Sequence, residues 1–289
     1  QALFAGRSPN TSYFHFVRAV GRDGTLTAYL QAGVMATDAA PPTAPGVPVS
    51  TVSATGLSLA WGAAGNALSK TTYTVEASTA ADFSAQGSPY RVSLDTAPSA
   101  GPMGSLSGLS VNTTYHLRVR GLSHNGNATS WTSLSSTSTL AAVPGSAAAA
   151  FLSVHAASMS VSWTANGSPV DQTTYTVVLT TGMDYPNALS GNVLVTTAPA
   201  GTSLQATPAG LSANTTYYLF VNGINRIGVG SVYAALGSTL TAADTPTPPG
   251  AGASTFTVVG ISSIAVRWGA GSNPAGTEYQ AEVSTSASF

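Results

Sequence analysis

The sequence contains no cysteine, which excludes disulfide scaffolds and thiolate metal sites. Charged residues are also scarce, at 7% of the 289 residues against roughly 25% in ordinary soluble proteins. The net charge is −1 and no basic stripe is present, so the sequence lacks the electrostatic features of a nucleic-acid-binding protein. Compositional drift in a secreted protein would explain the low charge. A surface adapted to close packing would explain it equally well.

Long hydrophobic runs are absent too. The longest candidate, Ala147 to Val154, is far shorter than the roughly 18 residues that a membrane span needs, and it contains Ser153. Gln1 is not an initiator methionine and no signal-peptide pattern is present, so we expect any signal or anchor to lie outside this sequence. Secretion is compatible with the lack of disulfides, because units of about 100 residues can bury a sufficient core unaided.

Catalytic and metal-binding patterns are missing as well. None of the histidines lies in a HExxH or comparable motif; they are His15, His116, His124 and His155. The acidic residues are scattered, and a calcium loop would need a denser set of Asp and Asn. We interpret His15 as a core or interface histidine, and Glu76 and Glu278 as residues of solvated faces. We therefore expect no catalytic residue, no metal and no cofactor.

The positive signal in the sequence is a repeat. The motif Asn-Thr-Ser/Thr-Tyr begins at Asn10, Asn112 and Asn214, with 102 residues from one copy to the next. Tryptophans follow the same rhythm, at spacings of 102 and 105 residues: Trp61, Trp163 and Trp268. A fixed period indicates that each period is one structural unit of an array.

Within each period the pattern is that of β-strands. Ahead of each repeated Trp, apolar side chains alternate with small or polar ones, as in the stretch Leu57 to Trp61. No segment has convincing helical periodicity. Pro-rich stretches at 41–45, 144 and 246–249 recur in phase and are typical of stiff linkers. Short strands joined by Gly, Ser, Thr and Asn favour an all-β sandwich.

These features resemble the fibronectin type III domain, in tandem arrays of the bacterial extracellular type. Leu109 to Tyr115 and Leu211 to Tyr217 fit its Leu-x-x-x-Thr-x-Tyr motif, and each Trp fits its second strand. The resemblance implies strands A, B, C, C′, E, F and G in each β-sandwich, with the motif tyrosine at a tyrosine corner. It implies six structural core residues: Trp61, Trp163, Trp268, Tyr13, Tyr115 and Tyr217.

The same resemblance divides the chain into four parts. Residues 39–140 and 141–242 are expected to be whole units. Residues 1–38 are expected to hold strands E to G of a partial unit, and residues 243–289 strands A to C of another. A half sandwich exposes one core face, so either the sequence is a window on a longer array or other chains complete the halves.

Outward aromatic side chains are the candidate contact surface. With Tyr13, His15 and Val17 facing inward, the neighbouring aromatic residues of that strand face outward, and the same argument applies two repeats later. The candidates are Phe14, Phe16, Tyr218 and Phe220. Outward aromatic pairs on a strand are typical of contact surfaces, but neighbouring side chains or the adjoining unit would also cover them.

Two sequence motifs admit structural explanations. Five Asn-x-Ser/Thr sequons occur, at Asn10, Asn112, Asn127, Asn166 and Asn214; the repeated ones fit a tight turn as well as glycosylation. Some fibronectin type III domains bind integrins through Arg-Gly-Asp. Here the corresponding turn, 21–24, has the order Arg-Asp-Gly, so that motif is absent.

The resulting expectation is a structural, non-enzymatic segment of a long extracellular or cell-surface repeat protein, such as a fibre, filament, stalk or sheath. Its partners would be copies of itself or further repeats of the same chain. The alternative is a non-catalytic spacer or carbohydrate-binding module of a larger secreted polysaccharide-acting enzyme or adhesin, with polysaccharide as the partner.

Overall fold

The computed structural model describes residues 2–186, 193–198, 200–201 and 203–286. Their regular structure is β-strand apart from one short 3-10 helix, Pro98–Ala100. The chain forms two compact units, residues 1–142 with 225–229, and residues 143–224 with 230–289. The expected all-β fold class is confirmed.

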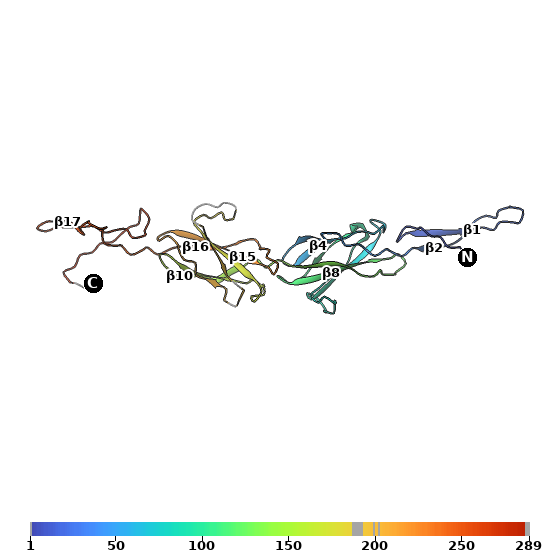
Figure 1. Cartoon of the computed structure of the whole chain (residues 1–289), viewed down its shortest axis with the longest axis horizontal. Helices are drawn as coiled ribbons and strands as arrows, with labels where there is room; N and C mark the ends of the chain where they lie inside the picture. Colours follow the sequence, from blue (N-terminus) through green and yellow to red (C-terminus); the bar gives the residue numbers. More distant parts are fainter. Residues whose placement is uncertain (1, 187–192, 199, 202, 287–289) are drawn as a thin grey trace. The chain divides into compact units, whose positions relative to one another are not determined.

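The first unit contains one complete β-sandwich, which we call the first sandwich (Figure 1). Its three-stranded sheet has the order β3-β4-β7 and its four-stranded sheet the order β6-β5-β8-β9, all antiparallel. The strands are β3 (Val49–Val52), β4 (Gly56–Ala60), β5 (Thr72–Ser78), β6 (Arg91–Asp95), β7 (Met103–Ser107), β8 (Thr114–Leu122) and β9 (Thr132–Ser138).

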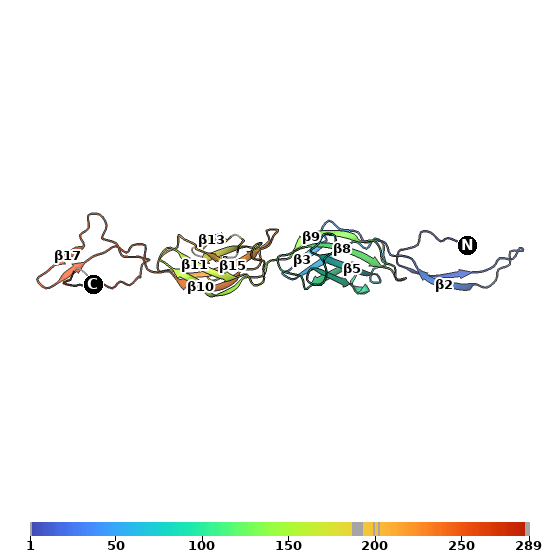
Figure 2. The same cartoon turned by 90° about the horizontal axis from the view of Figure 1, so that it is seen from below.

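The second unit contains a sandwich of the same topology, the second sandwich (Figure 2). Its sheets have the orders β10-β11-β14 and β13-β12-β15-β16. The strands are β10 (Gly145–Val154), β11 (Met159–Thr164), β12 (Thr174–Thr180), β13 (Val193–Ala198), β14 (Gln205–Ala206), β15 (Thr216–Ile224) and β16 (Ala234–Leu240). In both sandwiches, strands A, B and E therefore face strands C′, C, F and G.

Alternation along the strands builds the two cores. Every second residue of β8 from Tyr115 onward is buried, whereas the residues between them are half-buried. Trp61 is 4% exposed and packs against Tyr73 with ring centroids 5.4 Å apart. Trp163 is likewise buried, 5.3 Å from Tyr175. The tryptophans thus connect the two sheets of each sandwich, as the period-two pattern indicates.

Each repeated motif ends in a tyrosine corner. The hydroxyl oxygens of Tyr115 and Tyr217 accept hydrogen bonds from the backbone N–H groups of Ser110 and Ser212, at 2.9 and 3.0 Å. The Tyr13 hydroxyl oxygen accepts the equivalent bond from the backbone N–H five residues upstream, at 3.0 Å. These bonds fix the turn that leads into strand F.

Among the described residues, each terminal segment forms one two-stranded hairpin with no second sheet against it (Figures 1 and 2). The N-terminal hairpin pairs β1 (Ser12–Val17) with β2 (Leu30–Ala36), and the C-terminal hairpin pairs β17 (Phe256–Val259) with β18 (Ile264–Val266). The N-terminal hairpin corresponds to strands F and G, and the C-terminal hairpin corresponds to strands A and B. Residues 287–289 of the expected last segment lie outside the described residues, and the three boundaries between the expected domains stay predictions.

Two of the expected terminal strands do not form. Strand E would fall at residues 1–5 and strand C near 278–284, yet residues 2–5 and 278–284 have no strand structure. In the first sandwich strand E pairs with strand B, and strand C pairs with C′ and F. Neither terminal segment contains those partner strands, so the ladder hydrogen bonds that define a strand are not available there.

Candidate contact surfaces

The four outward aromatic residues do not form one kind of surface. Phe14 and Phe16 on β1 are 63% and 55% exposed. Tyr218 on β15 is half-buried, and Phe220 is only 5% exposed. The expectation of an outward contact residue is wrong for Phe220, because the ring of Tyr185 packs against it with centroids 5.6 Å apart.

Phe220 belongs to an aromatic cluster on the outer face of the second sandwich. Tyr185 contacts Tyr233 edge-on, at 5.0 Å between ring centroids. Burial, together with the hydrogen bond to Tyr185, raises the pKa of Tyr233 to about 12. This part of the sheet is therefore covered by the protein itself.

An equivalent cluster in the first sandwich is charged. Glu76 on β5 is buried, and its carboxylate accepts hydrogen bonds from Arg91 at 2.9 Å and from Arg118 at 2.8 Å. The Arg118 guanidinium lies 3.9 Å from the ring centroid of Phe83 and 4.0 Å from that of Trp131. The interpretation of Glu76 as a solvated residue is thus wrong, because arginine and aromatic side chains cover it.

The protonation of Glu76 follows from these contacts. Burial raises the pKa of Glu76, but the hydrogen bonds from Arg91 and Arg118 outweigh it, so the pKa is lowered overall. The carboxylate is therefore held ionised, and its ion pairs stabilise the outer face of the first sandwich.

A repeat signal for this face was present in the sequence and was missed. Tyr29, Trp131 and Tyr233 occupy one column, 102 residues apart. In the N-terminal hairpin, Tyr29 contacts Phe16 edge-on at 6.5 Å, and the Arg18 guanidinium lies 4.6 Å from its ring centroid. Because the residue at this position is Tyr, then Trp, then Tyr again, a search for identical residues does not find the repeat.

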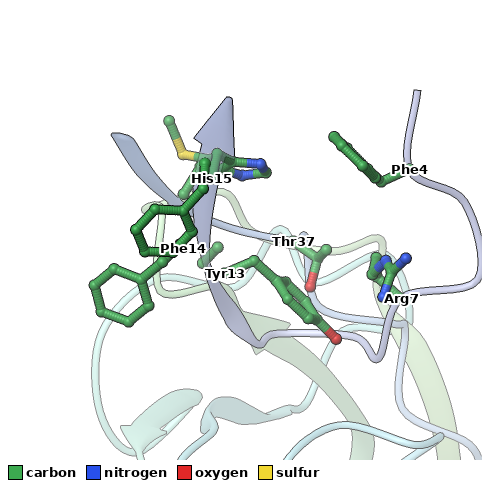
Figure 3. A pocket seen from close by; sticks show the side chains of 9 residues that line it. Phe4, Arg7, Tyr13, Phe14, His15 and Thr37 are labelled. Carbon is green, nitrogen blue, oxygen red and sulfur yellow. The ribbon is translucent and has the colours of Figure 1, made fainter. Parts of the chain in front are cut away.

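The opposite face of the N-terminal hairpin is an open apolar hollow of about 500 Å³. Figure 3 shows Phe4, Arg7, Tyr13, Phe14 and His15 among the side chains that line it. The rings of Phe4 and His15 lie 6.1 Å apart. In the first sandwich the position of His15 is occupied by Leu117, which is fully buried under the second sheet. The hollow is therefore the core face of a sandwich without its partner sheet.

The C-terminal hairpin also exposes an apolar face, at the positions that pack into the core in strands A and B of the two sandwiches. An open hollow of about 790 Å³ lies beside β17 and β18 and is lined by Phe256, Ile264 and Val266. Trp268 is 40% exposed, although its equivalents in the two sandwiches are buried. The expectation that Trp268 is a core residue is therefore wrong for the isolated chain: the ring of Tyr279 lies 5.8 Å from that of Trp268, and the Trp268 side chain still stays partly exposed.

Asp23 serves as a turn residue. Its carboxylate accepts hydrogen bonds from the hydroxyl and the backbone N–H of Thr25, at 2.8 and 3.1 Å. These bonds lower the pKa of Asp23. The hydrogen bonds between Asp23 and Thr25 therefore hold a β-hairpin turn, in which Gly24 has a positive φ of 85°.

The described part of the chain shows no group of three or more His, Asp or Glu residues placed to hold a metal ion. Within the same residues, no helix has the length and apolar character required to cross a membrane.

Comparisons with known proteins bear on the fold. No family model matches the sequence, and no curated protein matches it. A two-domain fibronectin type III segment from chicken tenascin is similar, with 18% identity, a TM-score of 0.41, and 70% of this chain and 99% of the other covered. The FN1–FN3 domains of chicken CNTN1 are similar with 16% identity, a TM-score of 0.31, and coverage of 81% and 78%. The described residues contain two β-sandwiches with the fold of fibronectin type III domains. This statement rests on the strand order A-B-E against C′-C-F-G and on the tyrosine corners.

Proposed function

We propose that the chain is a structural segment of an extracellular repeat protein, a fibre, filament, stalk or sheath, assembled end to end through β-sandwich stacking. Tandem fibronectin type III sandwiches support a structural or adhesion role of a generic kind. The specific proposal rests on one observation, the pair of open core faces on the terminal hairpins.

The open faces are unfavourable as they stand. A two-stranded hairpin is marginally stable in water on its own, and contiguous apolar surface of this kind marks a contact site. Ile264 and Val266 are exposed, whereas their equivalents in the first sandwich, Leu57 and Leu59, are about 1–2% exposed. The same positions thus form a dry core whenever the second sheet is present.

Each open face fits the other, and the second face can come from another copy of the chain or from a further repeat of the same chain. The N-terminal segment supplies strands F and G and the sequence of E, and the C-terminal segment supplies A and B and the sequence of C. Together they contain every strand of one sandwich except C′. A head-to-tail joint would place Trp268 above Tyr13, as Trp61 and Tyr115 share one core in the first sandwich. Such a heterologous joint propagates into an open filament unless the rotation closes it.

The test is concentration-dependent assembly of the full chain, followed by sedimentation velocity. We expect oligomers of increasing size as the concentration rises, and their loss in Trp268→Arg. Val232→Arg is the matched control, because Val232 is 72% exposed and lies outside both open faces. A chain that stays monomeric, or a Trp268→Arg chain that assembles like the parent, would contradict the proposal.

A second candidate is a non-catalytic, polysaccharide-binding module, favoured by the outer face of the N-terminal hairpin. Phe14, Phe16 and Tyr29 are all more than half exposed, and Arg18 lies over Tyr29. Exposed rings with a polar neighbour are suited to stack on sugar rings. Sedimentation with insoluble polysaccharide tests it: binding that Phe14→Ala and Phe16→Ala abolish would support this candidate. Retention of the variants equal to that of the parent would exclude this face.

A further inference from the structure

The asparagine that opens each repeated motif has an unusual environment. Asn10 has a left-handed backbone, with φ of 47°, and its side chain is fully buried. Its Nδ2 donates a hydrogen bond to Thr71 Oγ1 at 3.0 Å, and its Oδ1 accepts one from the backbone N–H of His124 at 2.7 Å. Thr71 and His124 belong to the first sandwich, whereas Asn10 belongs to the N-terminal segment. One amide therefore joins two segments of the first unit.

The same arrangement recurs in the other copies of the motif. Asn112 is fully buried at φ of 43°, and its Oδ1 accepts a bond from the backbone N–H of Arg226 at 2.8 Å, inside the first unit. Asn214, at φ of 46°, donates from Nδ2 to Thr277 Oγ1 at 2.9 Å, inside the second unit. His124 and Arg226 occupy the same position of successive repeats, 102 residues apart, and Thr71 and Thr277 follow the same strand-C alignment.

The chemistry of the partners requires an amide. The hydroxyl of Thr71 donates to the carbonyl of Ala67 at 3.0 Å, and that of Thr277 donates to the carbonyl of Pro274 at 2.9 Å. Each threonine oxygen is therefore available only as an acceptor, so the facing group must be a donor. The N–H of His124 requires an acceptor on the same side chain. Asparagine supplies both groups and also tolerates the left-handed backbone.

Further bonds reinforce the first of these contacts. The Asp38 carboxylate accepts hydrogen bonds from Nδ2 of Asn125 at 2.8 Å and of Asn127 at 2.9 Å. The Ser123 hydroxyl accepts a bond from the backbone N–H of Ala39 at 2.8 Å. These partners surround His124, so the turn that Asn10 contacts is also tied to the linker at Asp38 and Ala39.

We propose that Asn10 and Asn214 are joint clamps, each of which fixes its own segment to the segment that follows it inside the same unit, and that Asn112 forms the same clamp with the loop at Arg226 inside the first unit. The three corresponding sequons are then structural, because the amide that a glycan would modify is used in the joint. The observed bonds at all three residues support one rule within each unit: the turn asparagine holds the start of strand C or the F–G turn that it contacts.

Amide hydrogen exchange of the full chain, followed by NMR, tests this directly. Asn10→Gly and Asn112→Gly keep a backbone that tolerates positive φ but remove the amide. We expect protection of the His124 N–H to fall in Asn10→Gly, and protection of the Arg226 N–H to fall in Asn112→Gly, by about fivefold, which corresponds to one ordinary hydrogen bond.

The matched control is Asn166→Gly. Asn166 also has a positive φ, of 49°, and it is exposed, so this variant carries the same backbone change without a buried amide. It should leave both N–H groups as protected as in the parent. Core amides of β8 and β15 report whether each sandwich stays folded. The proposal is overturned if His124 and Arg226 are unprotected in the parent, or equally protected in their matched glycine variants.

Discussion

At the residue scale, Trp61 and Trp163 are large side chains buried in the two cores. Trp163 is 3% exposed and packs against Tyr175 between the two sheets. Trp163→Ala should lower the free energy of unfolding of the second sandwich by about 3–5 kcal/mol, as expected for a large core truncation. Denaturant unfolding measures this change. A loss below about 1 kcal/mol would place Trp163 outside the core, and Trp268→Ala in the monomer, where that side chain is partly exposed, should cost less.

From the lowered pKa of Glu76 we expect a pH dependence of stability that is specific to the first sandwich. The folded-state pKa is lowered, so the stabilisation is present above the unfolded value of 4.5 and is lost as the pH falls through the folded pKa. Glu76→Gln should lower the free energy of unfolding near pH 7 by about 1.5–3 kcal/mol, the scale of hydrogen bonds to charged groups. The variant should also show a weaker decline in stability toward pH 3.

The control for this experiment is Asp95→Asn, which removes an exposed carboxylate from the adjoining strand β6. Its denaturant midpoints at pH 7 and pH 3 should match those of the parent. The second sandwich has Val178 at the position of Glu76, so its acid response should be unaffected by Glu76→Gln. Equal acid sensitivity of Glu76→Gln and the parent would show that the ion pairs contribute nothing measurable.

At the element scale, the sequence located most strands but could not say which of them form. Alternation from Leu57 to Trp61 specifies the buried face of β4, because that property belongs to the strand itself. Strand pairing, in contrast, requires a second strand beside the first. Residues 2–5 and 278–284 have no such partner among the described residues and therefore form no strand, although their sequences match those of strands E and C. The ion pairs of Glu76 escaped prediction for the same reason, since Arg118 is 42 residues away and is brought close only by the pairing of β5 with β8.

Hydrogen exchange can measure whether the terminal strand sequences are paired. In the dilute, unassembled chain, amides of residues 2–5 and 278–284 should exchange freely, whereas those of β7 and β5, their equivalents in the first sandwich, should be protected. At concentrations where oligomers form, both terminal stretches should gain protection together. Protection of either stretch in the monomer would show that it already has a partner within the chain.

At the scale of the whole molecule, the two ends are expected to be complementary to each other but not to themselves. The face of the N-terminal hairpin offers Tyr13 and His15, and that of the C-terminal hairpin offers Ile264, Val266 and Trp268. Since the two faces consist of different strands of one sandwich, the proposed joint is heterologous. This property separates it from ordinary hydrophobic aggregation, in which any apolar face contacts any other.

Complementation between two variants tests that property. His15→Arg places a charge in the N-terminal face and Trp268→Arg places one in the C-terminal face, so neither variant alone should assemble. An equimolar mixture contains one intact face of each kind and should form heterodimers that grow no further, because any additional joint would bury at least one arginine. Sedimentation velocity and native mass spectrometry distinguish these species. Assembly of either variant alone would indicate contact between like faces, and a mixture that stays monomeric would exclude the head-to-tail joint.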